Sequence, residues 1–154
     1  MIQRIQSLYW LFAAALLVTF YFSDFAFVKS AVVSLTLSAF YGIECTPAGV
    51  YETSITTWPL HVLVVLATLL TLITIFLFKR RALQIRLSAV SIVLDLGLMG
   101  MAYFYYHQVA NGIADGLASL SMLYLLPFIA AILTFLGILG VKKDIAILRS
   151  LSRL

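Results

Sequence analysis

The chain has 154 residues, of which 64% are hydrophobic and only 10% are charged, and its mean hydropathy is +1.11. Soluble domains are about 45–50% apolar and about 25% charged, and so short a chain cannot bury this much apolar surface away from water. The net charge of +4 comes from basic residues that flank apolar segments, which favours membrane orientation over nucleic-acid binding.

Four apolar stretches are long enough to cross a bilayer, whose hydrocarbon core of about 30 Å needs about 20 helical residues. They cover about residues 5–23, 59–78, 87–107 and 119–141. The first resembles a signal peptide, but no small-x-small cleavage site follows it, so we expect it to remain as an anchor. We predict an all-α integral membrane fold, a bundle of four transmembrane helices that forms a single domain over residues 1–154.

The segment before the second span is too long for a simple connection. From Val33 to Tyr41, apolar residues alternate mainly with serine and threonine, a period of two that is typical of a strand. Cys45 to Gly49 contains turn residues, and Val50 to Thr57 is rich in threonine, tyrosine and β-branched residues. We predict a β-hairpin over residues 32–57 that covers the outer end of the bundle, and only a turn for the 108–118 loop.

Nine of the ten basic residues fall on one side of the predicted spans, and Lys29 is the exception. The nine are Arg4, Lys79, Arg80, Arg81, Arg86, Lys142, Lys143, Arg149 and Arg153. Because basic residues gather in short cytoplasmic loops, we predict that both termini are cytoplasmic.

The tail, residues 142–154, is short and basic. Ile145, Leu148 and Leu151 recur at helical spacing, while most of the basic residues fall elsewhere on the helix. This pattern predicts a short amphipathic helix on the anionic inner leaflet. The alternative is an extension of the fourth span that docks on a cytoplasmic partner.

Asp95 is the most informative polar residue because it lies inside the third predicted span. A charged acid there costs several kcal/mol unless it faces the bundle interior or water. Ser88 and Ser91 share its helical face, and Thr71 and Thr134 lie at a similar depth, where they could hydrogen-bond to the acid. Asp95, Thr71 and Thr134 are therefore predicted to form an intramembrane polar site, either a polar contact that fixes helix packing or a proton or ion site.

His61 and His107 lie at the outer ends of the second and third spans. Two histidines on adjacent antiparallel helices could supply the axial ligands of a haem, or bind a metal with help from Glu44 or Glu52. Amphipathic side chains are common at membrane interfaces without any ligand, so we expect no cofactor and no metal. Cys45 is the single cysteine, which excludes an internal disulfide. We expect it to be a small buried side chain, and a bond to another chain is the alternative.

No known catalytic motif occurs in the chain. A nucleophile elbow, a phosphate-binding loop, a His-Glu-x-x-His motif and a pair of intramembrane acids are all absent from the sequence. Four-span thiol oxidoreductases need paired cysteines, which this chain lacks. We therefore predict that it is not an enzyme.

The two ends of the chain carry short motifs of a more specific kind. They are Met1-Ile2-Gln3-Arg4-Ile5-Gln6 at the start, and Lys142-Lys143-Asp144, Arg149-Ser150 and Arg153-Leu154 at the end. With these motifs the whole chain resembles a family of small four-span proteins of Bacteroidota, described as domain of unknown function 4293. The resemblance implies a location in the inner membrane of a Gram-negative bacterium, and it implies no catalytic or ligand residue.

These observations favour a small accessory or scaffold subunit of an inner-membrane complex, with a membrane protein or further copies of itself as partner. The residues expected to contact a partner or lipid headgroups are Arg4, Lys142, Lys143, Arg149 and Arg153. The first alternative is a proton- or ion-coupled transporter or channel component that uses Asp95. The second is a haem-binding membrane protein that uses His61 and His107.

Overall fold

The computed structural model describes residues 2–30, 33–46, 56–77, 80–112 and 117–151. The helices are α1 (Ile2–Phe22), α2 (Trp58–Phe76), α3 (Arg81–Gly112), the short 3-10 helix η2 (Met122–Leu125) and α4 (Leu126–Leu151). The strands are β1 (Asp24–Lys29), β2 (Ser34–Ser38), β3 (Gly42–Thr46) and β4 (Leu117–Leu120).

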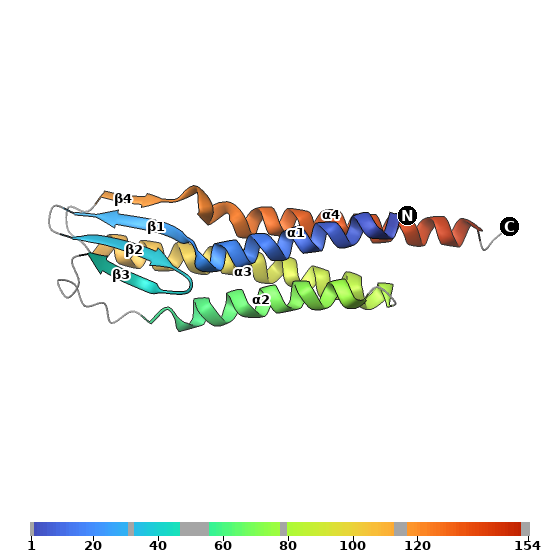
Figure 1. The fold of residues 1–154 in the computed structure, drawn as a ribbon, viewed down its shortest axis with the longest axis horizontal. Helices are drawn as coiled ribbons and strands as arrows, with labels where there is room; N and C mark the ends of the chain where they lie inside the picture. Colours follow the sequence, from blue (N-terminus) through green and yellow to red (C-terminus); the bar gives the residue numbers. More distant parts are fainter. Residues whose placement is uncertain (1, 31–32, 47–55, 78–79, 113–116, 152–154) are drawn as a thin grey trace.

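The four long helices form a bundle in which α1 and α3 each pack against both α2 and α4. The start of α1, the end of α2, the start of α3 and the end of α4 all lie at one end of the molecule, which we call the terminal end (Figure 1). The four strands lie at the opposite end, which we call the sheet end (Figure 1).

Three helical stretches of the described chain are long and apolar enough to cross a membrane, judged by length and composition. They are Trp58–Phe76, Arg81–Gly112 and Met122–Ile147, and the apolar stretch in α1, Ser7–Phe22, is shorter. Pro59 and Pro127 occupy the first turns of α2 and α4, where a missing backbone N–H removes no helical hydrogen bond. The molecule is thus mostly helical, with a small antiparallel sheet at one end.

The strands pair in the order β3-β2-β1-β4, and every pair is antiparallel. β4 follows α3 in the chain but pairs with β1, so that Leu120 lies opposite Ala26. The register shifts between Asp24 and Ala26, and this bulge lets the successive residues Phe25 and Ala26 both be buried. The sheet therefore joins segments of the chain that are far apart in sequence.

A tight turn at residues 39–41 connects β2 to β3. The backbone N–H of Tyr41 donates to the hydroxyl of Ser38 at 2.9 Å. Gly42 follows with φ of +80°, a left-handed conformation that favours glycine, and a Cβ atom there would lie 2.8 Å from Oγ1 of Thr57. This close approach places the turn against the start of α2.

One face of the sheet packs against the half of α3 nearer the sheet end. The buried cluster contains Phe20, Phe25, Ala26, Val28, Leu35, Leu37, Ala39, Leu60, Val64, Leu98, Ala102, Tyr105 and Val109. A second buried cluster lies between the helices and consists of Ala13, Leu17, Ala67 and Ala130. Large apolar side chains thus fill the sheet end, whereas small ones dominate the second cluster.

The structure has a larger sheet than the predicted hairpin. The alternating segment contains β2, whose two leucines are buried as the pattern predicts. Cys45 and Thr46 were expected in a turn, but they lie in β3 because the chain already turns at residues 39–41. Of the predicted second strand, residues 50–55 lie outside the described residues.

The predicted turn at 108–118 is also wrong, because α3 continues to Gly112 and β4 begins at Leu117. Ser119, the predicted start of the fourth span, lies in β4 instead. The predicted separate C-terminal helix is wrong as well, since α4 is unbroken from Leu126 to Leu151. No proline or glycine follows Gly140, so nothing ends the helix there, and the tail as far as Leu151 is an extension of α4.

Candidate functional site

A line of buried polar side chains follows the interior face of α3 from the terminal end to the middle of the helix. Its members are Gln84, Ser88, Ser91 and Asp95, and none is more than 4% exposed. Spacings of four, three and four residues place them on one face, as the sequence predicts for the last three. We call this set the polar line.

Two members of the polar line bind α2. The Thr71 hydroxyl donates to the carbonyl of Ala67 at 2.9 Å, so the Ser91 hydroxyl is the donor in the 2.8 Å bond between Ser91 and Thr71. Nearer the terminal end, Nε2 of Gln84 on α3 donates to the backbone carbonyl of Thr74 on α2 at 3.2 Å. These bonds fix α3 against α2 near the terminal end.

Asp95 is fully buried, and neither of its carboxylate oxygens has a hydrogen-bond partner among the described residues. The expected bonds from Thr71 and Thr134 do not form. Both threonines donate to carbonyls of their own helices, Thr134 to Ala130 at 2.9 Å. A buried carboxylate without a partner is costly, so Asp95 is the least satisfied group on the polar line.

The surroundings of Asp95 follow from the bond between Thr71 and Ser91. Asp95 is one turn beyond Ser91 on α3, and Ala67 is one turn beyond Thr71 on the antiparallel α2, both towards the sheet end. Ala67 packs in the second buried cluster with residues of α1 and α4, including Ala130. Asp95 therefore lies at the level where the helices present small side chains.

Two further buried polar atoms lack a partner among the described residues, Oγ of Ser88 and Nε1 of Trp10. Trp10 is packed tightly, because a Cβ atom at Gly137 on α4 would lie 2.9 Å from its Cε2. With the carboxylate of Asp95, these atoms make the terminal-end half of the interior rich in unsatisfied polar groups. Such an interior can bind a proton, an ion or a polar group.

His61 lies in the first turns of α2 beside a cluster of aromatic rings. Its Nε2 is 3.0 Å from the hydroxyl of Tyr21. Its ring contacts those of Tyr21, Phe40 and Trp58 at centroid distances of 5.1, 6.2 and 5.8 Å. Residues 39–41, Thr57, Trp58 and His61 line a cavity of about 320 Å³, which we call the aromatic pocket.

His107 contacts a different set of residues on α3. Its Nδ1 is 3.0 Å from Nδ2 of Asn111, and its ring lies 6.3 Å from that of Tyr103. None of these contacts joins His107 to His61. Within the described ranges, no group of three or more histidine, cysteine, aspartate or glutamate side chains is placed to hold a metal ion.

Four of the five basic residues expected at a partner or lipid surface belong to the terminal end. Lys142 and Lys143 are exposed on α4. Arg4 and Arg149 belong to α1 and α4, and Arg153 lies outside the described residues. The site residues predicted from sequence are thus spread over the bundle interior, the aromatic pocket, the part of α3 around His107 and the terminal end.

Sequence reasoning missed the aromatic pocket as a unit. The alternating pattern from Val33 to Tyr41 placed residues 39–41 in a strand, whereas they form a turn. The available signal was Gly42, since glycine is typical of turns and is unfavourable inside a strand.

The sequence model of one protein family, described as Domain of unknown function (DUF4293), matches residues 2–154. No curated protein and no solved structure is detectably similar to the chain.

Proposed function

We propose that this chain, which belongs to the family described as Domain of unknown function (DUF4293), is a non-enzymatic accessory or scaffold subunit of a complex in the bacterial inner membrane. The observation that supports this role is that two continuous helices extend the bundle in opposite directions. α3 carries the sheet at one end, and α4 continues past the start of α1 at the other (Figure 1).

The lengths of the helices support four membrane crossings with parts outside the bilayer. At 1.5 Å per residue, α3 with its 32 residues is about 48 Å long, which exceeds a hydrocarbon core of about 30 Å. α1 has 21 residues and is about 31 Å long, enough to cross between α2 and α4. The excess length of α3 carries the sheet, which therefore stands outside the hydrocarbon.

The distribution of charge supports a cytoplasmic terminal end. Arg80, Arg81, Lys142 and Lys143 all belong to that end, whereas Lys29 lies in β1 at the sheet end. By the positive-inside rule, both termini are cytoplasmic and the sheet is periplasmic.

Both projecting parts offer surfaces for a partner. β3 and β4 are the edges of the sheet, and an edge strand presents backbone groups to which another strand can pair. At the terminal end, the exposed Lys142 and Lys143 offer positive charge to an acidic partner. A small protein that carries a surface on each side of the membrane suits an accessory role.

Cysteine labelling tests the orientation. In a Cys45→Ser background, Lys29→Cys is expected to react with a membrane-impermeant maleimide in spheroplasts, and Lys142→Cys only after lysis. Both positions are exposed, so the two variants are a matched pair. The reverse pattern would overturn the orientation.

Purification from native membranes in a mild detergent tests the accessory role. The chain is expected to elute with a constant partner at a mass well above its own 17.1 kDa. Changing Lys142 and Lys143 together to glutamine should weaken a cytoplasmic contact, whereas Lys29→Gln at the sheet end should not. A chain that purifies alone, or only with copies of itself, contradicts the proposal.

A second function, proton or ion translocation, is favoured by one specific observation. Asp95 is fully buried without a partner among the described residues, and the polar line leads from it towards the terminal end. Intramembrane acids in such positions are typical of ion and proton pathways.

Proton flux into liposomes, followed with a pH-sensitive dye, tests this second function. Wild-type protein should conduct, Asp95→Asn should assemble normally but not conduct, and Asp144→Asn on the α4 extension should behave as wild type. Wild-type liposomes without flux under an imposed pH gradient and membrane potential would exclude it.

A further inference from the structure

We propose that the surface between α1 and α2 at the sheet end binds one phospholipid molecule with an ammonium-bearing headgroup. The acyl chain would lie in a groove between the two helices and the headgroup in the aromatic pocket. This inference rests on the membrane placement proposed above, and not on the accessory role.

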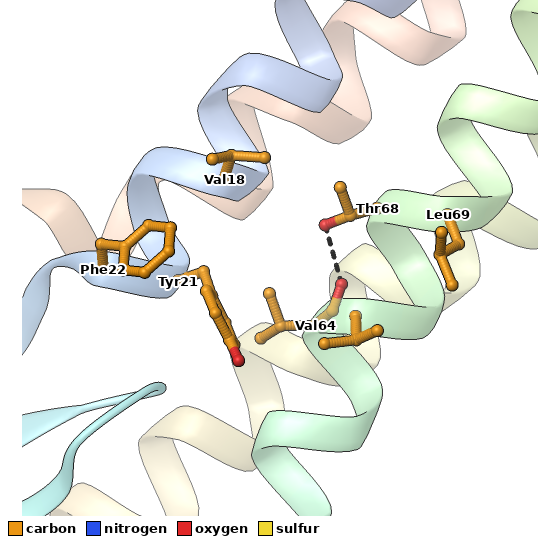
Figure 2. Close-up of a pocket in the computed structure, with 7 residues that line it drawn as sticks. Val18, Tyr21, Phe22, Val64, Thr68 and Leu69 are labelled. Atoms are coloured by element: carbon orange, nitrogen blue, oxygen red, sulfur yellow. Dashed lines mark hydrogen bonds between the residues drawn. The ribbon is translucent and has the colours of Figure 1, made fainter.

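The groove is apolar throughout. Val18, Tyr21 and Phe22 of α1 form one side, and residues of α2 form the other, including Val64, Thr68 and Leu69 (Figure 2). Its volume is about 190 Å³, and no polar atom is exposed in it. The one hydroxyl of α2 among its lining residues, that of Thr68, donates to the carbonyl of Val64 at 2.8 Å and is already satisfied.

The groove opens to the outside of the bundle, where lipid would be. Val18, Phe22, Val65 and Leu69 all line it, and each is 39% exposed or more. An acyl chain can therefore enter from the side without any movement of the helices. Since the groove lies towards the sheet end of α1 and α2, the acyl chain would belong to a lipid of the periplasmic leaflet.

The aromatic pocket has a different chemistry. It is lined by polar atoms as well as rings, and Trp58 and Tyr41 are 72% and 61% exposed. Phe40 lies 4.8 Å from Tyr41 between ring centroids, so the pocket presents several aromatic faces. An interfacial belt explains single aromatic residues, but it does not require a cavity with a histidine in its wall.

One side chain joins the two cavities. Tyr21 lines the groove, and its hydroxyl lies 3.0 Å from Nε2 of His61, which lines the pocket. The ring of Phe40 in the pocket lies 5.3 Å from the rings of both Tyr21 and Phe22. The apolar groove therefore ends where the aromatic pocket begins. The two cavities follow one another as the acyl chain and the headgroup of a lipid do.

The charges select the type of headgroup. No lysine, arginine, aspartate or glutamate lines either cavity among the described residues, so a headgroup with net charge would find no counter-ion. Aromatic faces attract an ammonium group, and the bonded pair of Tyr21 and His61 keeps one free donor, the hydroxyl or the imidazole N–H, for a phosphate. A zwitterionic phospholipid such as phosphatidylethanolamine satisfies both conditions, whereas phosphatidylglycerol lacks the cation.

Native mass spectrometry of the purified full chain tests the site with these two lipids at matched acyl chains. Wild type is expected to bind one phosphatidylethanolamine about tenfold more tightly than phosphatidylglycerol. Val65→Trp should fill the groove and lower the affinity for both lipids about tenfold or more. Val62→Trp is the control, because Val62 is exposed on the same helix and lines neither cavity.

Trp58→Ala tests the aromatic pocket separately. It should abolish the preference for phosphatidylethanolamine over phosphatidylglycerol, while the groove still binds the acyl chain of either lipid. Equal affinity of wild type for the two lipids, or unchanged binding by Val65→Trp, would overturn the proposal. Dimers that disappear in Val65→Trp would also overturn it, by showing that the groove is a contact between copies. If the protein binds the lipid but has no partner protein, the lipid site is still supported and only the accessory role is contradicted.

Discussion

The two halves of α3 face very different interiors. Towards the terminal end its buried residues are polar and bind α2 through hydrogen bonds, as Ser91 does with Thr71. Towards the sheet end they are mainly apolar, as Leu98 and Val109 are, and they pack against the sheet. One helix thus uses two ways of holding its neighbours.

On the membrane placement proposed above, the difference follows from the solvent around each half. In lipid there is no hydrophobic drive between helices, so close packing of small residues and interhelical hydrogen bonds hold them together. A sheet that stands in water gains stability by burying large apolar side chains. We therefore expect the buried residues of α3 to change from polar to apolar between Asp95 and Leu98, where packing against the sheet begins to replace packing between helices in lipid.

The largest expected effect is at the sheet end. Phe25 is buried in β1, and its ring stacks on that of Phe20 at 5.7 Å. Phe25→Ala should lower the free energy of unfolding by about 3 kcal/mol or more, because it leaves a cavity in the cluster. Thermal unfolding in detergent, followed by circular dichroism, measures this loss.

Phe27→Ala is the matched control, since Phe27 is only half-buried on the same strand. A clearly smaller loss is expected there. Equal losses at the two positions would mean that burial against α3 does not stabilise the sheet end.

A smaller effect is expected from overpacking at the terminal end. A Cβ atom at Gly137 would lie 2.9 Å from the Trp10 ring, so Gly137→Ala should destabilise the protein by about 1–3 kcal/mol. Gly100→Ala is the control, since a Cβ atom there would have nothing within 4 Å. In mid-helix, alanine should be more stable than glycine by about 0.5–1 kcal/mol. Chemical denaturation of both variants in one detergent gives opposite signs if small-residue packing matters as described.

The smallest effect separates two serines of the polar line. Ser91→Ala removes the hydrogen bond to Thr71 and should cost about 0.6 kcal/mol, the average for such bonds in membrane helices. Ser88→Ala removes a buried hydroxyl that has no partner among the described residues, so it should be neutral or slightly stabilising. Unfolding curves of the two variants under the same conditions compare their losses of stability. A greater loss for Ser88→Ala than for Ser91→Ala would show that the Ser88 hydroxyl has a binding partner in the folded protein.

The helices could be predicted from the sequence because each apolar run carries its own signal. The polar face of α3 was predictable for the same reason, since Ser88, Ser91 and Asp95 recur at helical spacing. β1 and β4 could not be predicted, because they stabilise one another across α2 and α3 and neither has a strong pattern alone. The predicted hydrogen-bond partners of Asp95, Thr71 and Thr134, were wrong because depth along the predicted spans does not fix the direction in which a threonine hydroxyl points.

The pairing of β1 with β4 also sets an order of events during synthesis. β1, β2 and β3 leave the ribosome before α2, whereas β4 follows only after α3. At about 5–20 residues per second, the free edge of β1 waits on the order of ten seconds for its partner. During that time the nascent chain exposes a strand edge that the finished protein covers, and β4 covers it just before α4 is synthesised.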